Sequence, residues 1–75
     1  MPRVIAQREE SDIYLIQVSE TEGRIADFES GKYFPAFNIQ SIIARGYWIE
    51  LTEAEQSERG QSVLDRLSEL TDVKG

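Results

Sequence analysis

Five of the seven aromatic residues of this chain lie in one stretch, from position 33 to position 51. A chain of 75 residues buries only about 60% of the surface that it exposes when unfolded. It therefore needs large side chains to fill its interior, and aromatic rings bury the most area per residue. We expect the rings between Tyr33 and Trp48, including Phe34, Phe37 and Tyr47, to point inward and join sheet to helices. Tyr33 and Trp48 are expected to be partly exposed, because both fall beside or opposite the inward positions.

Four segments have the composition of β-strands, rich in β-branched and aromatic residues and bounded by turn residues. The apolar run at 13–16 is typical of a central strand that is covered on both faces. The first three segments are joined by loops too short for a crossover, which predicts an antiparallel meander. Gly23 is expected to supply a positive φ in the turn before the third segment. The four segments are Val4–Ala6, Ile13–Val18, Arg24–Phe28 and Tyr47–Leu51.

The last of these segments alternates, so Tyr47, Ile49 and Leu51 share one face and Trp48 and Glu50 the other. A short helix is predicted just before it, at 39–45, from the helical spacing of three isoleucines. Asn38 is a favourable N-cap for this helix. Gly46 stands where a glycine in the left-handed conformation would end it.

A capping box formed by Thr52 and Glu55 predicts that a second helix begins at about position 53. Gly60 weakens this helix by roughly 1 kcal/mol relative to alanine and marks a candidate break. An apolar stripe follows, and we expect the helix to reach about Leu70 and residues 71–75 to be frayed. The stripe either covers the sheet or pairs with a partner helix or a second copy. It consists of Val63, Leu64, Leu67 and Leu70.

These patterns predict a single α+β domain spanning residues 1–75. It has a small antiparallel sheet of three to four strands (a meander), a short helix, and a C-terminal helix packed on one face.

The formal net charge is −6, from 14 acidic and 8 basic side chains. This charge opposes binding to phosphate backbones and favours attraction of a basic partner. The chain contains no cysteine and no histidine, which excludes disulfides, thiolate metal sites and histidine acid–base chemistry. A secreted domain of this size would be expected to carry disulfides, so we expect a cytoplasmic protein. No apolar run is long enough to span a membrane, and no signal-peptide core is present.

We find no motif for catalysis, for a cofactor or for a metal. The acidic groups lack the spacing of a calcium loop, and the glycines are isolated and fit no phosphate-binding loop. The serines have no histidine to activate them. The sequence therefore predicts a protein that is not an enzyme, with no cofactor and no metal ion.

The first functional hypothesis is a small acidic interaction module, acting as a regulator, accessory subunit or inhibitor of another protein. Its partner would carry a basic surface, and the aromatic rings would serve as anchors. One alternative is a nucleic-acid or small-ligand binder that uses the aromatic stretch and Arg3, Arg8, Arg24 and Arg45. The other is a structural homo-oligomer, such as a homodimer joined by the leucine stripe. The expected partner-binding residues are Tyr33, Trp48, Glu53, Glu55, Glu58, Asp65 and Glu69.

Overall fold

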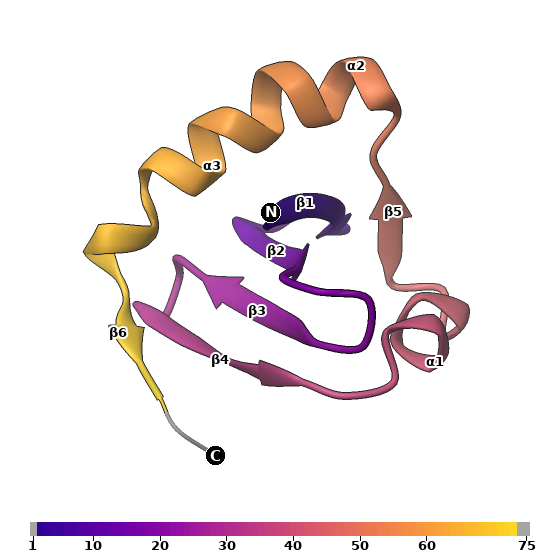
Figure 1. The fold of residues 1–75 in the computed structure, drawn as a ribbon, viewed down its shortest axis with the longest axis horizontal. Helices are drawn as coiled ribbons and strands as arrows, with labels where there is room; N and C mark the ends of the chain where they lie inside the picture. Colours follow the sequence, from indigo (N-terminus) through magenta and orange to yellow (C-terminus); the bar gives the residue numbers. More distant parts are fainter. Residues whose placement is uncertain (1, 74–75) are drawn as a thin grey trace.

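The computed structural model describes residues 2–73 and has an α+β architecture with one curved sheet and two helical segments (Figure 1). The sheet is mixed and has six strands in the order β5-β1-β2-β3-β4-β6. All neighbouring strands are antiparallel except β4 and β6, which are parallel. The strands are β1 (Arg3–Arg8), β2 (Ile13–Gln17), β3 (Gly23–Asp27), β4 (Lys32–Ala36), β5 (Trp48–Glu50) and β6 (Thr71–Asp72).

The helical segments lie between β4 and β5 and between β5 and β6. The first is α1 (Ile39–Ala44). The second is one helical path that curves over the sheet in Figure 1. It is made of α2 (Glu53–Glu55), the π-helical turn η1 (Gln56–Gly60), α3 (Gln61–Asp65) and the 3₁₀ turn η2 (Leu67–Glu69).

The predicted meander is confirmed, because β1, β2 and β3 pair in sequence as antiparallel neighbours. The prediction of three to four strands is wrong, because β4 and β6 add two more. β4 contains Pro35, a residue that weakens the sequence signal for a strand. Proline is tolerated here because β6 pairs with β4 only at Lys32 and Tyr33, leaving Pro35 on an open edge. Thr71 and Asp72 form β6 where a frayed end was expected; residues 74–75 lie outside the described residues.

The sheet separates two apolar cores, because it is covered on both faces. The helix-side core contains Val4, Tyr14, Ile16, Ala26, Leu51 and Val63. The α1-side core contains Ala6, Leu15 and Ala36, with half-buried isoleucines of α1 and Trp48 packed against it. A bulge at Ile5 explains why Val4 and Ala6 face opposite cores, since it shifts the register between their partners on β2.

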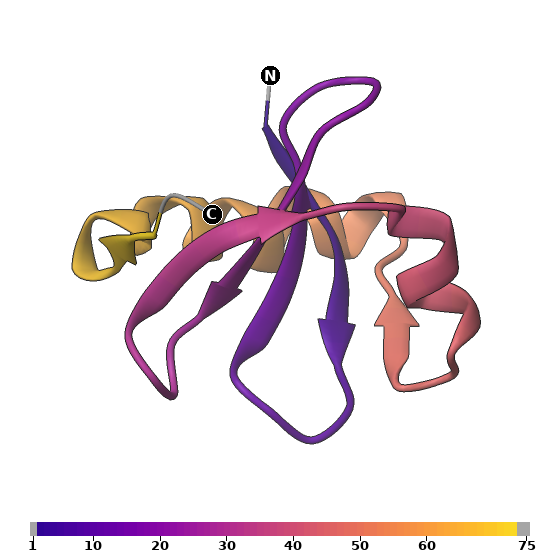
Figure 2. The same ribbon diagram turned by 90° about the horizontal axis from the view of Figure 1, so that it is seen from below.

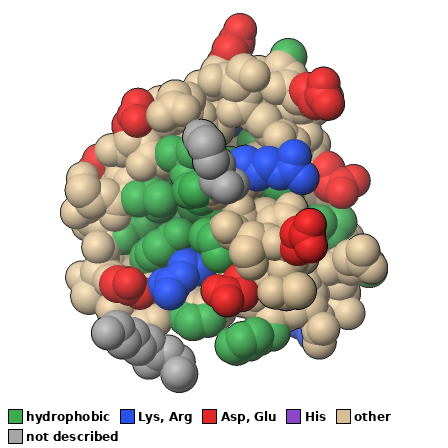
Figure 3. All heavy atoms as spheres, viewed as in Figure 1, with side chains coloured by type: hydrophobic (Ala, Val, Ile, Leu, Met, Phe, Trp, Pro, Cys, Tyr) green, Lys and Arg blue, Asp and Glu red, His purple; other side chains and the backbone are tan. Residues whose placement is uncertain are grey.

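The helical path after β5 runs through Gly60 without a break, which the sequence left open. Gly60 has helical dihedral angles, and it is buried where the helix crosses β1. The stripe from Val63 to Leu70 packs on the helix-side core, and Val63 is only 2% exposed. Figure 3 shows apolar side chains gathered inside the arc formed by α3, β3 and β4, where this core reaches the surface. The stripe therefore covers the sheet, which removes the support for a dimer joined through it.

The expectation that the rings between 33 and 48 form the core is wrong for two of the five. Phe37 is 80% exposed and Tyr47 is 61% exposed, whereas Tyr33, Phe34 and Trp48 are half-buried. The most deeply buried large side chains instead come from the first two strands. They are Leu15, Ile16 and Val4.

Four local predictions meet different outcomes. The capping box is confirmed: Thr52 Oγ1 accepts from the Glu55 amide at 3.2 Å, and Glu55 Oε1 accepts from the Thr52 amide at 3.0 Å. Asn38 occupies the N-cap of α1, but its backbone is left-handed (φ 56°) and its side chain makes no capping bond. Gly46 has the predicted positive φ of 83°, whereas Gly23 does not have one. Gly23 is needed for another reason: Ile39 of α1 lies directly over it.

Candidate docking surface at the β5 edge

β5 is an edge strand, since it pairs with β1 on one side only. The Glu9 amide donates to the Tyr47 carbonyl at 2.9 Å, and the Leu51 amide donates to the Ile5 carbonyl at 2.9 Å. Inward-directed backbone groups alternate along an antiparallel strand, so Tyr47, Ile49 and Leu51 face β1. The N–H and C=O groups of Trp48 and Glu50 point away from β1 and have no backbone partner within residues 2–73.

The side chains of β5 and of the residues on either side of it divide between the two faces of the sheet as the alternation predicts. Leu51 is buried in the helix-side core and Trp48 packs in the α1-side core. Figures 1 and 2 both place α1 on the β5 side of the molecule, and α1 packs against the face that carries Trp48. Tyr47 and Ile49 belong to the opposite face, together with Leu51. The helix covers Leu51, but Tyr47 and Ile49 (56% exposed) lie beyond its reach.

Polar side chains border Tyr47 and Ile49 on the helix side. Gln7 is the register partner of Ile49, and its Oε1 accepts from Arg59 Nη1 at 3.1 Å. Arg59 also forms an ion pair of 3.6 Å with Glu55. The exposed apolar pair therefore adjoins the first turns of the acidic helix. We refer to Tyr47, Ile49 and the outward backbone of Trp48 and Glu50 as the β5 edge surface.

The expected partner-binding residues do not form one surface. Tyr33 lies on β4 and packs in the helix-side core, whereas Trp48 lies on β5 and packs on the other face of the sheet. The guanidinium of Arg24 covers the Tyr33 ring at 5.0 Å and forms an ion pair of 2.7 Å with Asp72. Burial raises the pKa of the Tyr33 phenol above its ordinary value of 10.0. Tyr33 is therefore held in packing, at the other end of the sheet from β5.

The acidic residues of the helix are mostly exposed, but some are already engaged. Glu53, Glu58, Asp65 and Glu69 are exposed, whereas Glu55 is half-buried. The backbone and hydroxyl hydrogen bonds with Thr52 lower the pKa of Glu55 below its ordinary 4.5. Glu69 lies 3.8 Å from Arg66.

Arg66 attaches the end of α3 to the sheet. Its Nη2 and Nη1 donate to the two carboxylate oxygens of Asp12, at 3.1 and 3.4 Å. Its guanidinium also stacks over the Phe28 ring at 4.0 Å. The bidentate geometry and the stacking are typical of a structural arginine, so we assign this cluster to stability.

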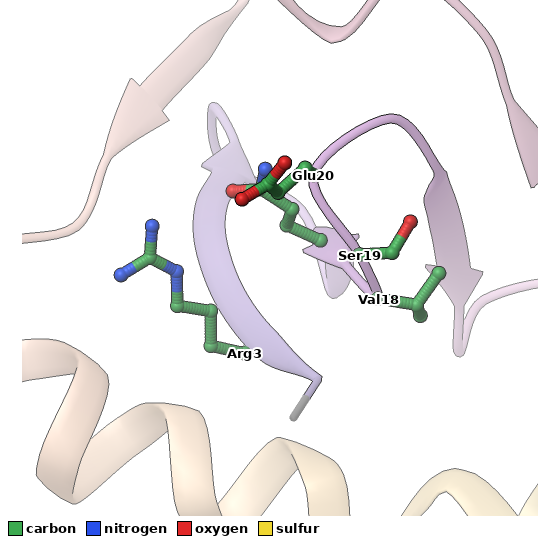
Figure 4. A pocket seen from close by; sticks show the side chains of 5 residues that line it. Arg3, Val18, Ser19 and Glu20 are labelled. Carbon is green, nitrogen blue, oxygen red and sulfur yellow. The ribbon is translucent and has the colours of Figure 1, made fainter.

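Two kinds of feature are absent from the part of the chain that the structure describes, a metal-binding cluster and a membrane-spanning helix. No group of three or more acidic residues within 2–73 could hold a metal ion. No helix of this part of the chain is both long and apolar enough to cross a membrane. Figure 4 shows an open hollow on the surface, where Arg3 lies across from Val18, Ser19 and Glu20. The expected absence of enzymatic activity, cofactor and metal remains a prediction.

The four arginines of the nucleic-acid hypothesis are not gathered on one surface. Arg3 and Arg8 stand at opposite ends of β1, Arg24 is held by Asp72, and Arg45 follows α1. This arrangement gives the hypothesis no support.

Sequence reasoning placed Tyr47 and Ile49 on the correct face but missed their exposure. The alternating pattern identifies the two faces of a strand, whereas exposure depends on how far the covering helix extends. Comparisons of the chain with protein-family models, with curated proteins and with solved structures found no match.

Proposed function

We propose that this protein is a non-enzymatic interaction module that binds a partner protein through the β5 edge surface and the adjoining acidic helix. The observation that carries the proposal is the exposure of Ile49 on an edge strand and of Tyr47 directly before that strand, on the same face. An isolated exposed apolar residue needs no explanation, but two beside unpaired strand backbone are typical of a docking site.

The size of the apolar pair sets a limit on what it contributes. Covering the exposed parts of Tyr47 and Ile49 removes roughly 200 Å² of apolar surface, worth about 5 kcal/mol before the costs of association. Those costs are of the order of 4–15 kcal/mol, so the two side chains are anchors rather than a complete interface. Further contacts must come from the neighbouring backbone and from the acidic helix.

The charge of the helix indicates the kind of partner. Residues 53–69 carry five acidic and two basic side chains, and both arginines are engaged in ion pairs. Exposed carboxylates such as Glu53 and Glu58 would attract a basic surface over about 10 Å at 0.1 M salt. Their contribution is to the rate of encounter and to the choice of partner more than to the final affinity.

Affinity capture from a lysate of the source cells, with a matched set of variants, tests the proposal. The double variant Tyr47→Ser/Ile49→Ser removes the anchors. Phe37→Ser is the control, because it removes a ring that is even more exposed than Tyr47 and lies beside Gly23 and Pro35, away from β5. We expect a captured protein that is lost with the double variant, retained with Phe37→Ser, and captured less at high salt. Equal capture by all three proteins, or no capture by the native chain, would overturn the proposal.

A further inference from the structure

The free edge of β5 offers four backbone groups in one row. The N–H and C=O of Trp48 and of Glu50 point outward, while those of Ile49 between them face β1. We propose that β5 receives an extended segment of the partner as an added strand of the sheet. This inference rests on the proposed function and names the binding mode and the chemistry of the segment. An edge with unpaired groups is the feature that strand addition uses, with backbone hydrogen bonds for affinity and side chains for specificity.

The two faces of β5 determine which side chains the added strand would carry. Residues of the segment on the helix side would lie beside Tyr47 and Ile49, where branched apolar side chains pack well. Residues on the other side would lie beside Trp48 and Glu50. Because Glu50 is exposed there, lysine or arginine is the favoured neighbour. The segment therefore alternates between apolar and basic residues.

Acidic side chains at both ends of the edge support this choice. Glu9 and Glu10 are exposed beside Tyr47, where the Glu9 amide bonds to the Tyr47 carbonyl. Glu53 is exposed just beyond the other end of the strand. Glu50 and Glu53 lie at the free edge itself, whereas Glu9 and Glu10 stand on the β1 side of Tyr47, next to the exposed Arg8, and act on a basic segment only at longer range. A second copy of this chain is a poorer occupant, because it would bring together two molecules of charge −6 and two Glu50 side chains.

Amide hydrogen exchange in the full chain measures the proposed contact directly. The probe is a heptapeptide of alternating lysine and valine, and its glutamate–valine counterpart is the charge control. We expect the Trp48 and Glu50 amides to exchange at least about tenfold more slowly with the basic peptide, with a smaller change at Ile49. The acidic peptide should leave all three unchanged. Unchanged exchange at Trp48 and Glu50 with the basic peptide at millimolar concentration would overturn the inference.

Two substitutions at position 50 separate the contribution of the backbone N–H to peptide binding from the contribution of the side-chain charge. Glu50→Pro removes an outward N–H that β1 does not use, and proline is tolerated at such edge positions. Glu50→Thr loses the same charge but keeps the N–H. We expect Glu50→Pro to weaken peptide binding at least about fivefold more than Glu50→Thr, while both variants keep the native circular dichroism spectrum. Equal weakening would show that no strand is added.

The same variants distinguish this inference from the proposed function. If a lysate partner depends on Tyr47 and Ile49 but binds Glu50→Pro and Glu50→Thr equally, the interaction module stands and strand addition is wrong. If no partner depends on Tyr47 and Ile49, the proposed function fails, and strand addition with it.

Discussion

Substitution of Gly23 by alanine tests how α1 is seated on the sheet. A Cβ built at Gly23 would lie 2.6 Å from Ile39 Cδ1, 2.7 Å from Ile39 Cγ1 and 3.3 Å from the Ala36 carbonyl oxygen. Overpacking of this kind costs about 1–3 kcal/mol. Replacing a glycine in a strand by alanine stabilises the fold by about 0.5–1 kcal/mol, which offsets part of this cost. We therefore expect Gly23→Ala to lower the free energy of unfolding by about 1–2 kcal/mol, and Tm by about 4–8 °C per kcal/mol.

Gly60→Ala is the matched control, because the same methyl group makes only ordinary van der Waals contacts there. Its Cβ would lie 3.6 Å from Val4 Cβ, an ordinary contact, and its backbone is already helical. We expect this variant to be more stable than the native chain by about 0.5–1 kcal/mol.

Urea unfolding followed by Trp48 fluorescence measures both variants, and a double-mutant cycle assigns the cause. Ile39→Ala removes the two closest atoms and leaves only the 3.3 Å contact with the Ala36 carbonyl oxygen, so Gly23→Ala should cost much less in that background than in the native chain. If Gly23→Ala were neutral in the native chain, or equally harmful beside Ile39→Ala, the seating of α1 described above would be incorrect.

Three further outcomes are expected. Thr52→Ala should cost about 1 kcal/mol in urea unfolding, because it removes the capping box, whereas Ser57→Ala on the same helix should cost less. Leu15→Ala should cost about 2–5 kcal/mol, a large part of the stability of so small a domain, while Phe37→Ser should change it by less than about 0.5 kcal/mol. Burial alone would raise the pKa of Asp27, but hydrogen bonds from Ser30 and Glu29 outweigh it and lower the pKa below 3.8. At low pH the unfolded state then binds more protons than the folded state. The contribution of Asp27 to the free energy of unfolding is therefore complete above about pH 4 and is lost as the pH drops through the lowered pKa. In the variant Asp27→Asn, whose side chain still accepts these hydrogen bonds, the free energy of unfolding should decrease less steeply with falling pH.

Local patterns in the sequence predicted what local interactions determine. The Thr52 capping box, the left-handed Gly46 and the first three strands depend on neighbouring residues, and the structure contains all of them. β6 could not be predicted in this way, because two residues become a strand only through β4, which is about forty positions earlier. The role of Gly23 depends likewise on where Ile39 lies.

In the candidate site, too, the sequence predicted what depends on neighbouring residues and missed what depends on distant ones. The alternating pattern placed Tyr47, Ile49 and Leu51 on one face of the sheet. The burial of Leu51 in the helix-side core shows that this is the face covered by the helix. Whether Tyr47 and Ile49 are also covered depends on where the helix crosses the sheet. The capping box starts the helix directly after Leu51 and directs it over β1, so it leaves the beginning of β5 bare. The acidic positions were predicted to lie on the surface, but their grouping with Tyr33 required the sheet order, which the sequence does not contain.

Site-specific photo-crosslinking in the source cells tests most directly whether the β5 edge surface is where a partner binds. A benzophenone amino acid is placed at position 49 in one variant and at position 37 in another, since both native side chains are more than half exposed. The account predicts a discrete crosslinked protein from position 49 and none from position 37. Crosslinking from position 37 alone, or the same product from both positions, would contradict it.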